Sequence, residues 1–65
     1  MIDADGTEWL TYSDAAQAVR VRVGTLKVWV HRGRVEARRT GRTVWLNMRD
    51  TRVAEQAWTR RRTAL

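Results

Sequence analysis

The stretch that decides the fold is VRVRVGTLKVWVHRGRV, residues 19–35, because its hydrophobic period changes halfway along. Valine and arginine alternate over residues 19–23, as residues do in a short strand. From there on, Leu26, Trp29 and Val30 recur at the spacing of one helical face, and Gly33 follows as a residue that commonly ends a helix. The second pattern predicts a helix over about residues 23–32.

Residues 20–22 then form a tight turn in front of this helix, and a strand over 19–23 is the competing interpretation. Before the turn, Thr11 and Asp14 match the capping pattern T-x-x-D ahead of an apolar stripe that starts at Tyr12. This pattern predicts a first helix over about residues 12–19. Two helices joined by a turn of three residues form the helix-turn-helix pattern.

The residues after Gly33 return to a period of two. Alternation over residues 34–46 is interrupted by TGR (40–42), in which Gly41 supplies a positive φ, and this predicts a β-hairpin with a basic tip. Asn47, with Asp50 three residues on, predicts the start of a last helix over about residues 48–60. Its expected inner stripe is Met48, Val53 or Ala54, Ala57 and Trp58.

The expected fold is therefore mostly α with a small β-hairpin, in one compact domain over residues 9–60. A flexible lead-in over residues 1–8 and a basic tail over 61–65 flank it. A chain of 65 residues buries only about 60% of the surface that it exposes when unfolded, so its margin of stability is small. The tryptophans are expected to compensate, since each buries roughly 150–250 Å²; they are Trp9, Trp29, Trp45 and Trp58.

The composition excludes several kinds of site. The chain has no cysteine, which rules out disulfides and thiolate zinc sites, and its single histidine cannot build a metal site alone. There is no glycine-rich phosphate loop and no carboxylate pair suited to acid–base chemistry, because Asp14 and Asp50 are explained as helix-start residues. We therefore expect no enzyme activity, no metal and no cofactor.

The charge balance points to an anionic partner. Thirteen basic residues, all but one of them arginine, stand against seven acidic ones, which gives a net charge of +6. Nucleic acid and an anionic membrane surface are the two candidate partners. No apolar run approaches the roughly 18 residues that span a bilayer, and the acidic start MIDADGTEWL is unlike a signal peptide. The expected location is the cytoplasm.

The segments LTYSDAAQAV, VGTLKVWVHRGRVEARRTGRTVWLNMRD and AEQAW resemble the small winged helix-turn-helix domains of the excisionase and MerR-like group. The resemblance covers about residues 9–60, and it departs from the family pattern at Arg20, where glycine is usual, and at Arg22, where serine or threonine is usual. The matching positions are Leu10, Thr11, Asp14, Ala15, Ala16, Val21, Thr25, Leu26, Arg32, Gly33, Val35, Gly41, Leu46, Ala57 and Trp58.

The resemblance implies that the second helix enters the major groove of double-stranded DNA and that the hairpin lies as a wing against the neighbouring minor groove or backbone. Excisionases of this type are accessory proteins of recombination. They bind repeated sites cooperatively, bend the DNA and direct a partner integrase of the tyrosine or serine class. A small phage or bacterial transcriptional regulator is the alternative that the resemblance leaves open.

The candidate DNA-binding residues follow from the two faces of the second helix. With Leu26, Trp29 and Val30 inside, the outward set is Gly24, Thr25, Lys27, Val28, His31 and Arg32. Arg20 and Arg22 flank it from the turn, and Arg38, Arg39 and Arg42 surround the hairpin tip. A wider core stripe is the other explanation for Val28, and a solvated histidine for His31.

Two alternatives to DNA binding also stay open. Trp45 is expected to point away from Val44 and Leu46, where it serves either as a wing residue against the sugar backbone or as a protein contact. A protein-interaction module would work through Trp45 and the arginines at 60–62. A membrane-active peptide would require one continuous basic amphipathic helix, and Gly24, Gly33, Gly41 and two separate helix caps interrupt the chain too often for that. This alternative is therefore remote, and we expect no membrane partner.

Overall fold

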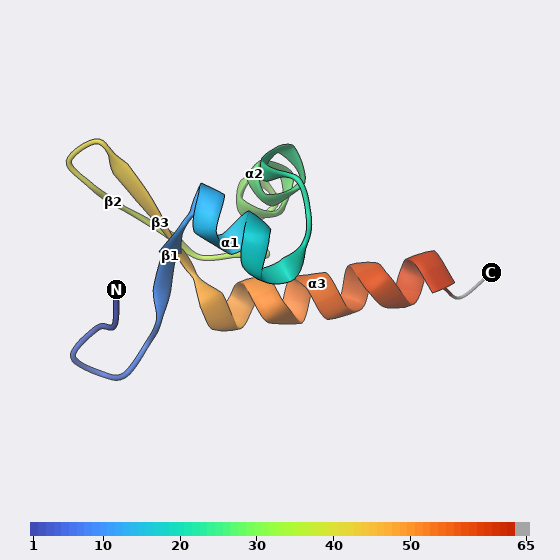
Figure 1. Cartoon of the computed structure of the whole chain (residues 1–65), viewed down its shortest axis with the longest axis horizontal. Helices are drawn as coiled ribbons and strands as arrows, with labels where there is room; N and C mark the ends of the chain where they lie inside the picture. The colour runs from blue at the N-terminus through green and yellow to red at the C-terminus, as the bar shows by residue number, and fades with distance from the viewer. Residues whose placement is uncertain (64–65) are drawn as a thin grey trace.

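Three helices and one three-stranded antiparallel sheet make up residues 1–63, the part of the chain that the computed structural model describes (Figure 1). In chain order the elements are β1 (Trp9–Thr11), α1 (Tyr12–Val19), α2 (Val23–His31), β2 (Ala37–Thr40), β3 (Thr43–Asn47) and α3 (Met48–Thr63). The expected class, mostly α with a hairpin, missed one strand, and the fold is mixed α/β. Of the expected tail, residues 61–63 continue α3, and residues 64 and 65 lie outside the described part.

The start of α1 and the end of α2 lie where local chemistry predicts. The backbone N–H of Asp14 donates to Thr11 Oγ1 over 3.2 Å, which confirms Thr11 as the cap of α1. At the end of α2, Gly33 has a φ of 76°, and its N–H donates to the carbonyl of Val30 while that of Arg34 donates to Trp29. These two hydrogen bonds form a Schellman motif, which ends the helix. The helix over 23–32 is confirmed to within one residue, and the competing strand over 19–23 is wrong.

The turn between α1 and α2 places a bulky residue in the left-handed region. Arg20 has a φ of 55°, the only positive φ among the described residues other than glycine. Its N–H and that of Val21 both bond to the carbonyl of Ala16, which closes α1. This conformation costs an L-residue roughly 1–2 kcal/mol, because its Cβ crowds the following carbonyl. The position is therefore one where glycine fits the backbone better than arginine.

We expect Arg20→Gly to stabilise the domain. Removal of the left-handed strain is partly offset by the greater freedom of glycine in the unfolded chain, about 0.5–1 kcal/mol, so the net gain is about 0.5–1 kcal/mol. For a domain of this size that corresponds to about 2–8 °C in Tm, measurable by calorimetry. Arg20→Ala is the control, because it removes the same side chain and keeps the strain; equal gains in both variants would refute this explanation.

The sheet has the order β1-β3-β2, so the hairpin β2–β3 is joined by a third strand from the start of the domain. Leu10 pairs with Leu46, which in turn pairs with Ala37, and these three side chains face the helices. The hairpin turn is tight, with Gly41 at a φ of 61° directly after Thr40, which confirms the expected glycine turn. β1 was missed because three residues are too few to show a period of two.

The first eight residues fold back on β1. Ile2 forms a bridge with Glu8, the N–H of Trp9 donates to the carbonyl of Met1 over 2.7 Å, and the N–H of Asp3 donates to Thr7 over 2.7 Å. The segment expected to be a lead-in thus makes its own backbone hydrogen bonds with the strand. Its flexibility stays a prediction, because hydrogen bonds in one structure do not measure motion.

The last helix begins as expected, but the residues on its buried face differ in part from the expected inner stripe. Asn47 Oδ1 accepts from the N–H of Asp50 over 3.2 Å, which confirms the cap. Met48 and Ala54 are buried, but Ala57 is exposed and Val53 is 63% exposed, so Val53 was the wrong alternative. Thr51 is fully buried instead, and its hydroxyl donates to the carbonyl of Asn47 over 2.8 Å. That bond lets a polar side chain occupy the inner face of the helix.

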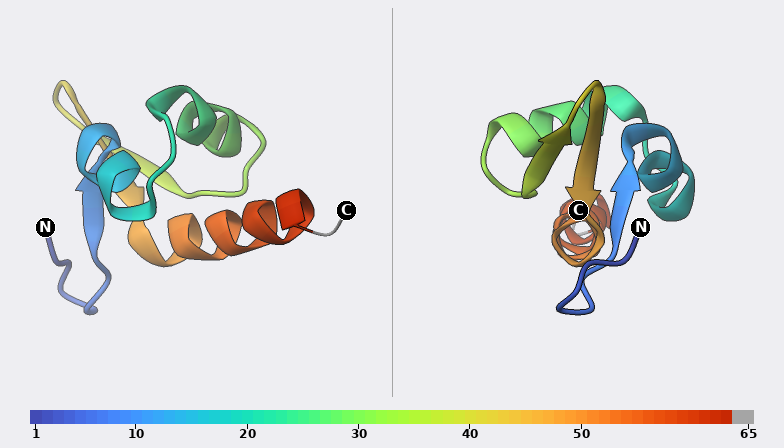
Figure 2. Two further views of the ribbon diagram at one scale, coloured as in Figure 1. Left: turned by 45° about the vertical axis from the view of Figure 1, so that its right-hand side comes forward. Right: turned by 90° about the vertical axis from the view of Figure 1, so that its left-hand side faces the viewer.

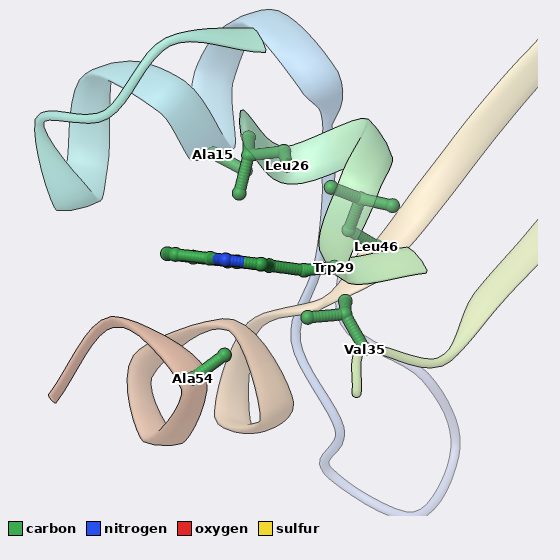
Figure 3. Close-up of a cluster of buried hydrophobic side chains, with 6 residues drawn as sticks. All are labelled: Ala15, Leu26, Trp29, Val35, Leu46 and Ala54. Atoms are coloured by element: carbon green, nitrogen blue, oxygen red, sulfur yellow. The ribbon is translucent and has the colours of Figure 1, made fainter. Parts of the chain in front are cut away.

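Trp29 is the centre of the core. Figure 3 shows its ring lying between Ala15 and Leu26 on one side and Ala54 on the other, with Leu46 and Val35 at its edge. Trp58 meets it edge-on, with ring centroids 6.3 Å apart. Of the four tryptophans that were expected to stabilise the domain, only these two pack in the main cluster. Trp9 is 1% exposed but lies outside that cluster, and Trp45 is half-buried.

Candidate nucleic-acid interface

Helix α2 presents a polar, cationic face opposite its buried one. Leu26 and Trp29 are buried and Val30 packs half-buried against the same core, as the helical spacing predicts. On the other side Gly24, Lys27, Val28 and His31 are exposed, and Arg32 is exposed just after the helix. Thr25 is half-buried. Val28 is 47% exposed, so the wider core stripe is not its explanation.

The N-terminal end of α2 is open to close approach by a ligand. A Cβ placed on Gly24 would meet no atom within 4 Å, so packing inside the protein does not require glycine there. Lys27 leans toward the start of α1, with its ammonium 5.8 Å from the centre of the Tyr12 ring. Arg20 and Arg22 are exposed in the turn that leads into this end. Arg22 begins α2 without a side-chain cap, since arginine has no acceptor.

The hairpin divides its arginines between two faces. Alternation along β2 puts Arg39 on the face of Ala37 and Val44, which is the face that packs on the helices. Arg38 lies on the opposite face, directly across from Trp45. Arg42 is exposed in the turn itself. This difference between Arg38 and Arg39 was visible in the sequence, because neighbouring residues of a strand that leads into the turn at Gly41 point to opposite faces of the sheet.

The hairpin tip and α2 project on the same side of the molecule, and α3 lies on the other (Figure 1 and Figure 2). The N-terminal loop, which carries Asp3, Asp5 and Glu8, also points away from α2 (Figure 1 and Figure 2). Hydrogen bonds from Thr7 to the Asp5 carboxyl lower the pKa of Asp5. The side that carries α2 and the hairpin tip, called the basic side below, thus lies away from the acidic loop, while α3 on the other side carries exposed arginines of its own, Arg49, Arg52 and Arg61.

The cations on the basic side have no carboxylate partner. Among the described residues, both ion pairs within 4 Å involve Arg38, with Asp3 and with Glu36. The unpaired set is Arg22, Lys27, Arg32, Arg39 and Arg42. Arg20 forms no ion pair within 4 Å either, but it lines a shallow pocket with Arg52 and Glu55 of α3. Cations held together without acidic neighbours repel one another, and an anionic ligand relieves that repulsion.

The molecule offers little for other chemistries. The described residues contain no group of three histidine, cysteine or acidic side chains that would hold a metal ion. An open groove of about 470 Å³ between the N-terminal loop and the start of α3 is lined by acids, Asp5 and Glu8, as well as by Arg49 and Arg52. Within residues 1–63, no helix has both the length and the apolar composition needed to cross a bilayer.

Comparisons with family models, with curated proteins and with solved structures found no match for this chain.

Proposed function

We propose that this protein binds double-stranded DNA as a small winged helix-turn-helix domain and acts as an accessory factor of the excisionase type. In this proposal α2 is the recognition helix and the β2–β3 hairpin is the wing. The observation that carries the proposal is that α2 and the hairpin tip project on the same side of the molecule (Figure 1 and Figure 2) and that both carry exposed cations without a carboxylate partner. An α-helix of α2's width fits the major groove, which is about 12 Å wide.

Each outward residue of α2 and of its flanks has a role suited to its chemistry. Lys27 donates to a guanine edge, Thr25 bonds a base or a phosphate at the start of the helix, and Val28 contacts a thymine methyl group. Gly24 leaves room for the backbone to approach a phosphate at the helix N-terminus. Arg20, Arg22, His31 and Arg32 contact phosphates on either side.

The wing reads the shape of the duplex. Arg42 at the tip and Arg39 on the helix-facing side of β2 are placed to enter or flank a narrow minor groove, where arginine is attracted by the enhanced negative potential. Trp45 lies on the other face of the hairpin, away from Arg39. We assign Trp45 to a protein contact, with an integrase or a second copy of this chain.

The small size of the domain argues for cooperative binding. One recognition helix of nine residues contacts only a few base pairs, and each correct pair contributes about 1–3 kcal/mol of discrimination. Useful selectivity in a genome therefore requires several copies side by side or a larger partner. This favours an accessory protein that self-associates on DNA and directs a tyrosine or serine integrase over a self-sufficient repressor.

Footprinting on genomic DNA around the gene tests this proposal. Protected tandem repeats inside an attachment region would support an excisionase, whereas one protected site over a promoter would assign the same contacts to a transcriptional regulator. A gel shift with excess non-specific competitor is the companion measurement. Failure to retain any duplex at low ionic strength would refute DNA binding, and the protein-interaction alternative would then remain.

The salt dependence of binding is expected to be steep. Roughly five phosphate contacts give a slope of log K against log salt of about −4 to −5, because each contact releases condensed counterions. Fluorescence anisotropy with a labelled duplex over a range of salt concentrations measures it. A slope near zero would contradict the phosphate contacts assigned to the turn, to α2 and to the hairpin.

A further inference from the structure

We propose that Arg38 is a positioning residue that holds the wing in its orientation, and that it leaves the DNA contacts of the wing to Arg39 and Arg42. This inference rests on the proposed DNA-binding function. It separates three neighbouring arginines that the sequence alone places together around one turn.

The guanidinium of Arg38 is already occupied on several sides. Its Cζ lies 4.6 Å from the centre of the Trp9 ring, which is the geometry of a cation–π stack. Its Nη1 is 3.2 Å from Asp3 Oδ2, and its Nε is 4.0 Å from Glu36 Oε2. Trp9 belongs to β1 at the far edge of the sheet, so the Arg38 side chain reaches across β3 to make this stack.

These contacts continue into a network that joins the base of the wing to α3. Glu36 donates its N–H to Asp50 Oδ2 over 3.0 Å, and its carbonyl accepts from the N–H of Asn47 over 2.9 Å. Asn47 Nδ2 also lies 3.4 Å from Glu36 Oε1. Asp50 and Asn47 together start α3, as described above. The residue before β2 is thus tied to the helix cap on one side and to Arg38 on the other.

Contact between Arg38 and a phosphate would require this arrangement to break. Arg38 lies on the sheet face opposite Arg39, and the helices that carry the proposed DNA surface lie on the face of Arg39. To reach DNA on that side, the guanidinium would have to leave both Trp9 and Asp3. Arg39 and Arg42 have no carboxylate to leave and are exposed.

The arrangement depends on arginine rather than on positive charge alone. A planar guanidinium stacks on an indole ring while its edge bonds to a carboxylate, whereas a lysine ammonium is a point charge that cannot do both. A phosphate contact made at a distance by a wing residue, by contrast, is largely preserved by lysine. Arg38→Lys therefore distinguishes a positioning role from a charge role.

The test compares Arg38→Ala and Arg38→Lys with Arg39→Ala and Arg42→Ala. Anisotropy titrations with a labelled duplex of random sequence, repeated over a range of salt, give the slope of log K against log salt for each variant. We expect Arg39→Ala and Arg42→Ala each to make this negative slope less steep by about 0.9, the value of one phosphate contact. Both Arg38 variants should keep the wild-type slope and weaken binding by the same factor.

Thermal unfolding without DNA supplies the second readout. Both Arg38 variants should lower Tm by about 4–8 °C, as expected for loss of one cation–π stack in a domain of this size. Arg39→Ala and Arg42→Ala should change Tm less. Amide hydrogen exchange should rise in the hairpin more than in α2 for Arg38→Lys, which shows loosening of the wing rather than general instability.

A wild-type affinity for Arg38→Lys together with a slope reduced by about 0.9 for Arg38→Ala would show that Arg38 contacts a phosphate, and would overturn the inference. Unchanged Tm and exchange in both Arg38 variants would overturn it as well. If the wild-type protein does not bind duplex DNA at all, the proposed function fails, while the unfolding and exchange measurements still decide whether Arg38 holds the hairpin.

Discussion

Trp29→Ala is expected to remove most of the stability of the domain. The ring is 4% exposed and lies between α1, α2 and α3, where it contacts residues from each (Figure 3). Truncation of a buried aromatic residue costs about 3–5 kcal/mol, because the transfer free energy is lost and a cavity remains. Small domains lie near the lower end of the usual range of about 5–15 kcal/mol, so the loss consumes most of the stability. Urea unfolding followed by circular dichroism measures it.

Val28→Ala is the matched control on the same helix. Val28 lies on the exposed side of α2, and surface substitutions of this kind usually change the free energy of unfolding by less than about 0.5 kcal/mol. The contrast between the two variants tests which face of α2 is buried. Comparable losses in both would mean that α2 is turned about its axis relative to the core, and the assignment of its outward face would have to be abandoned.

Lys27→Ala is expected to have the largest effect on DNA recognition. Loss of a base-edge contact costs about 1–3 kcal/mol, which is about 5–150-fold in affinity for the specific site. Binding to random-sequence duplex should fall much less, because only one charge of the whole surface is lost. Lys27 is exposed, with its ammonium 5.8 Å from the centre of the Tyr12 ring, so the fold should be retained. Competition titrations with site-bearing and random duplexes measure the two affinities separately.

Arg42→Ala is the control for charge. Its side chain lies at the hairpin tip, and its removal should weaken binding to both kinds of duplex by the same factor, with the slope reduced by about 0.9. If Lys27→Ala also weakened both kinds of duplex equally, α2 would not be the element that reads the bases. The specific contact would then have to lie in the turn or in the wing.

The helix boundaries were the part of the fold most accessible from the sequence. Thr11 and Asn47 accept hydrogen bonds from residues three positions on, and Gly33 takes the left-handed conformation that ends α2. Each of these interactions spans only a few residues, so a short local pattern contains all the information needed. The same holds for the hairpin turn at Gly41 and for the two faces of α2.

The outward residues of the candidate site were predictable for the same reason. Once Leu26 and Trp29 are inside, helical geometry alone turns Lys27, Val28 and His31 outward. The role of Arg38 was not predictable in this way. Its partners Trp9 and Asp3 lie 29 and 35 positions away along the chain, and no local period connects them.

Local sequence patterns were sufficient to predict the three helices, the caps of α1 and α3, the stop of α2, the hairpin and the outward face of α2, because those features depend on neighbours within one or two turns of the chain. The end of α3 was not predicted, since the helix continues to Thr63 rather than ending near residue 60. Other features became visible only in the folded molecule: residues 9–11 form the third strand, and Ala54 rather than Val53 faces the core. Trp29 and Trp58 share that core, whereas Trp9 stacks with Arg38, whose other partner is Asp3. The physical reason is that these outcomes depend on which distant surfaces pack together, and the free energy of packing is a property of the assembled core rather than of any short segment.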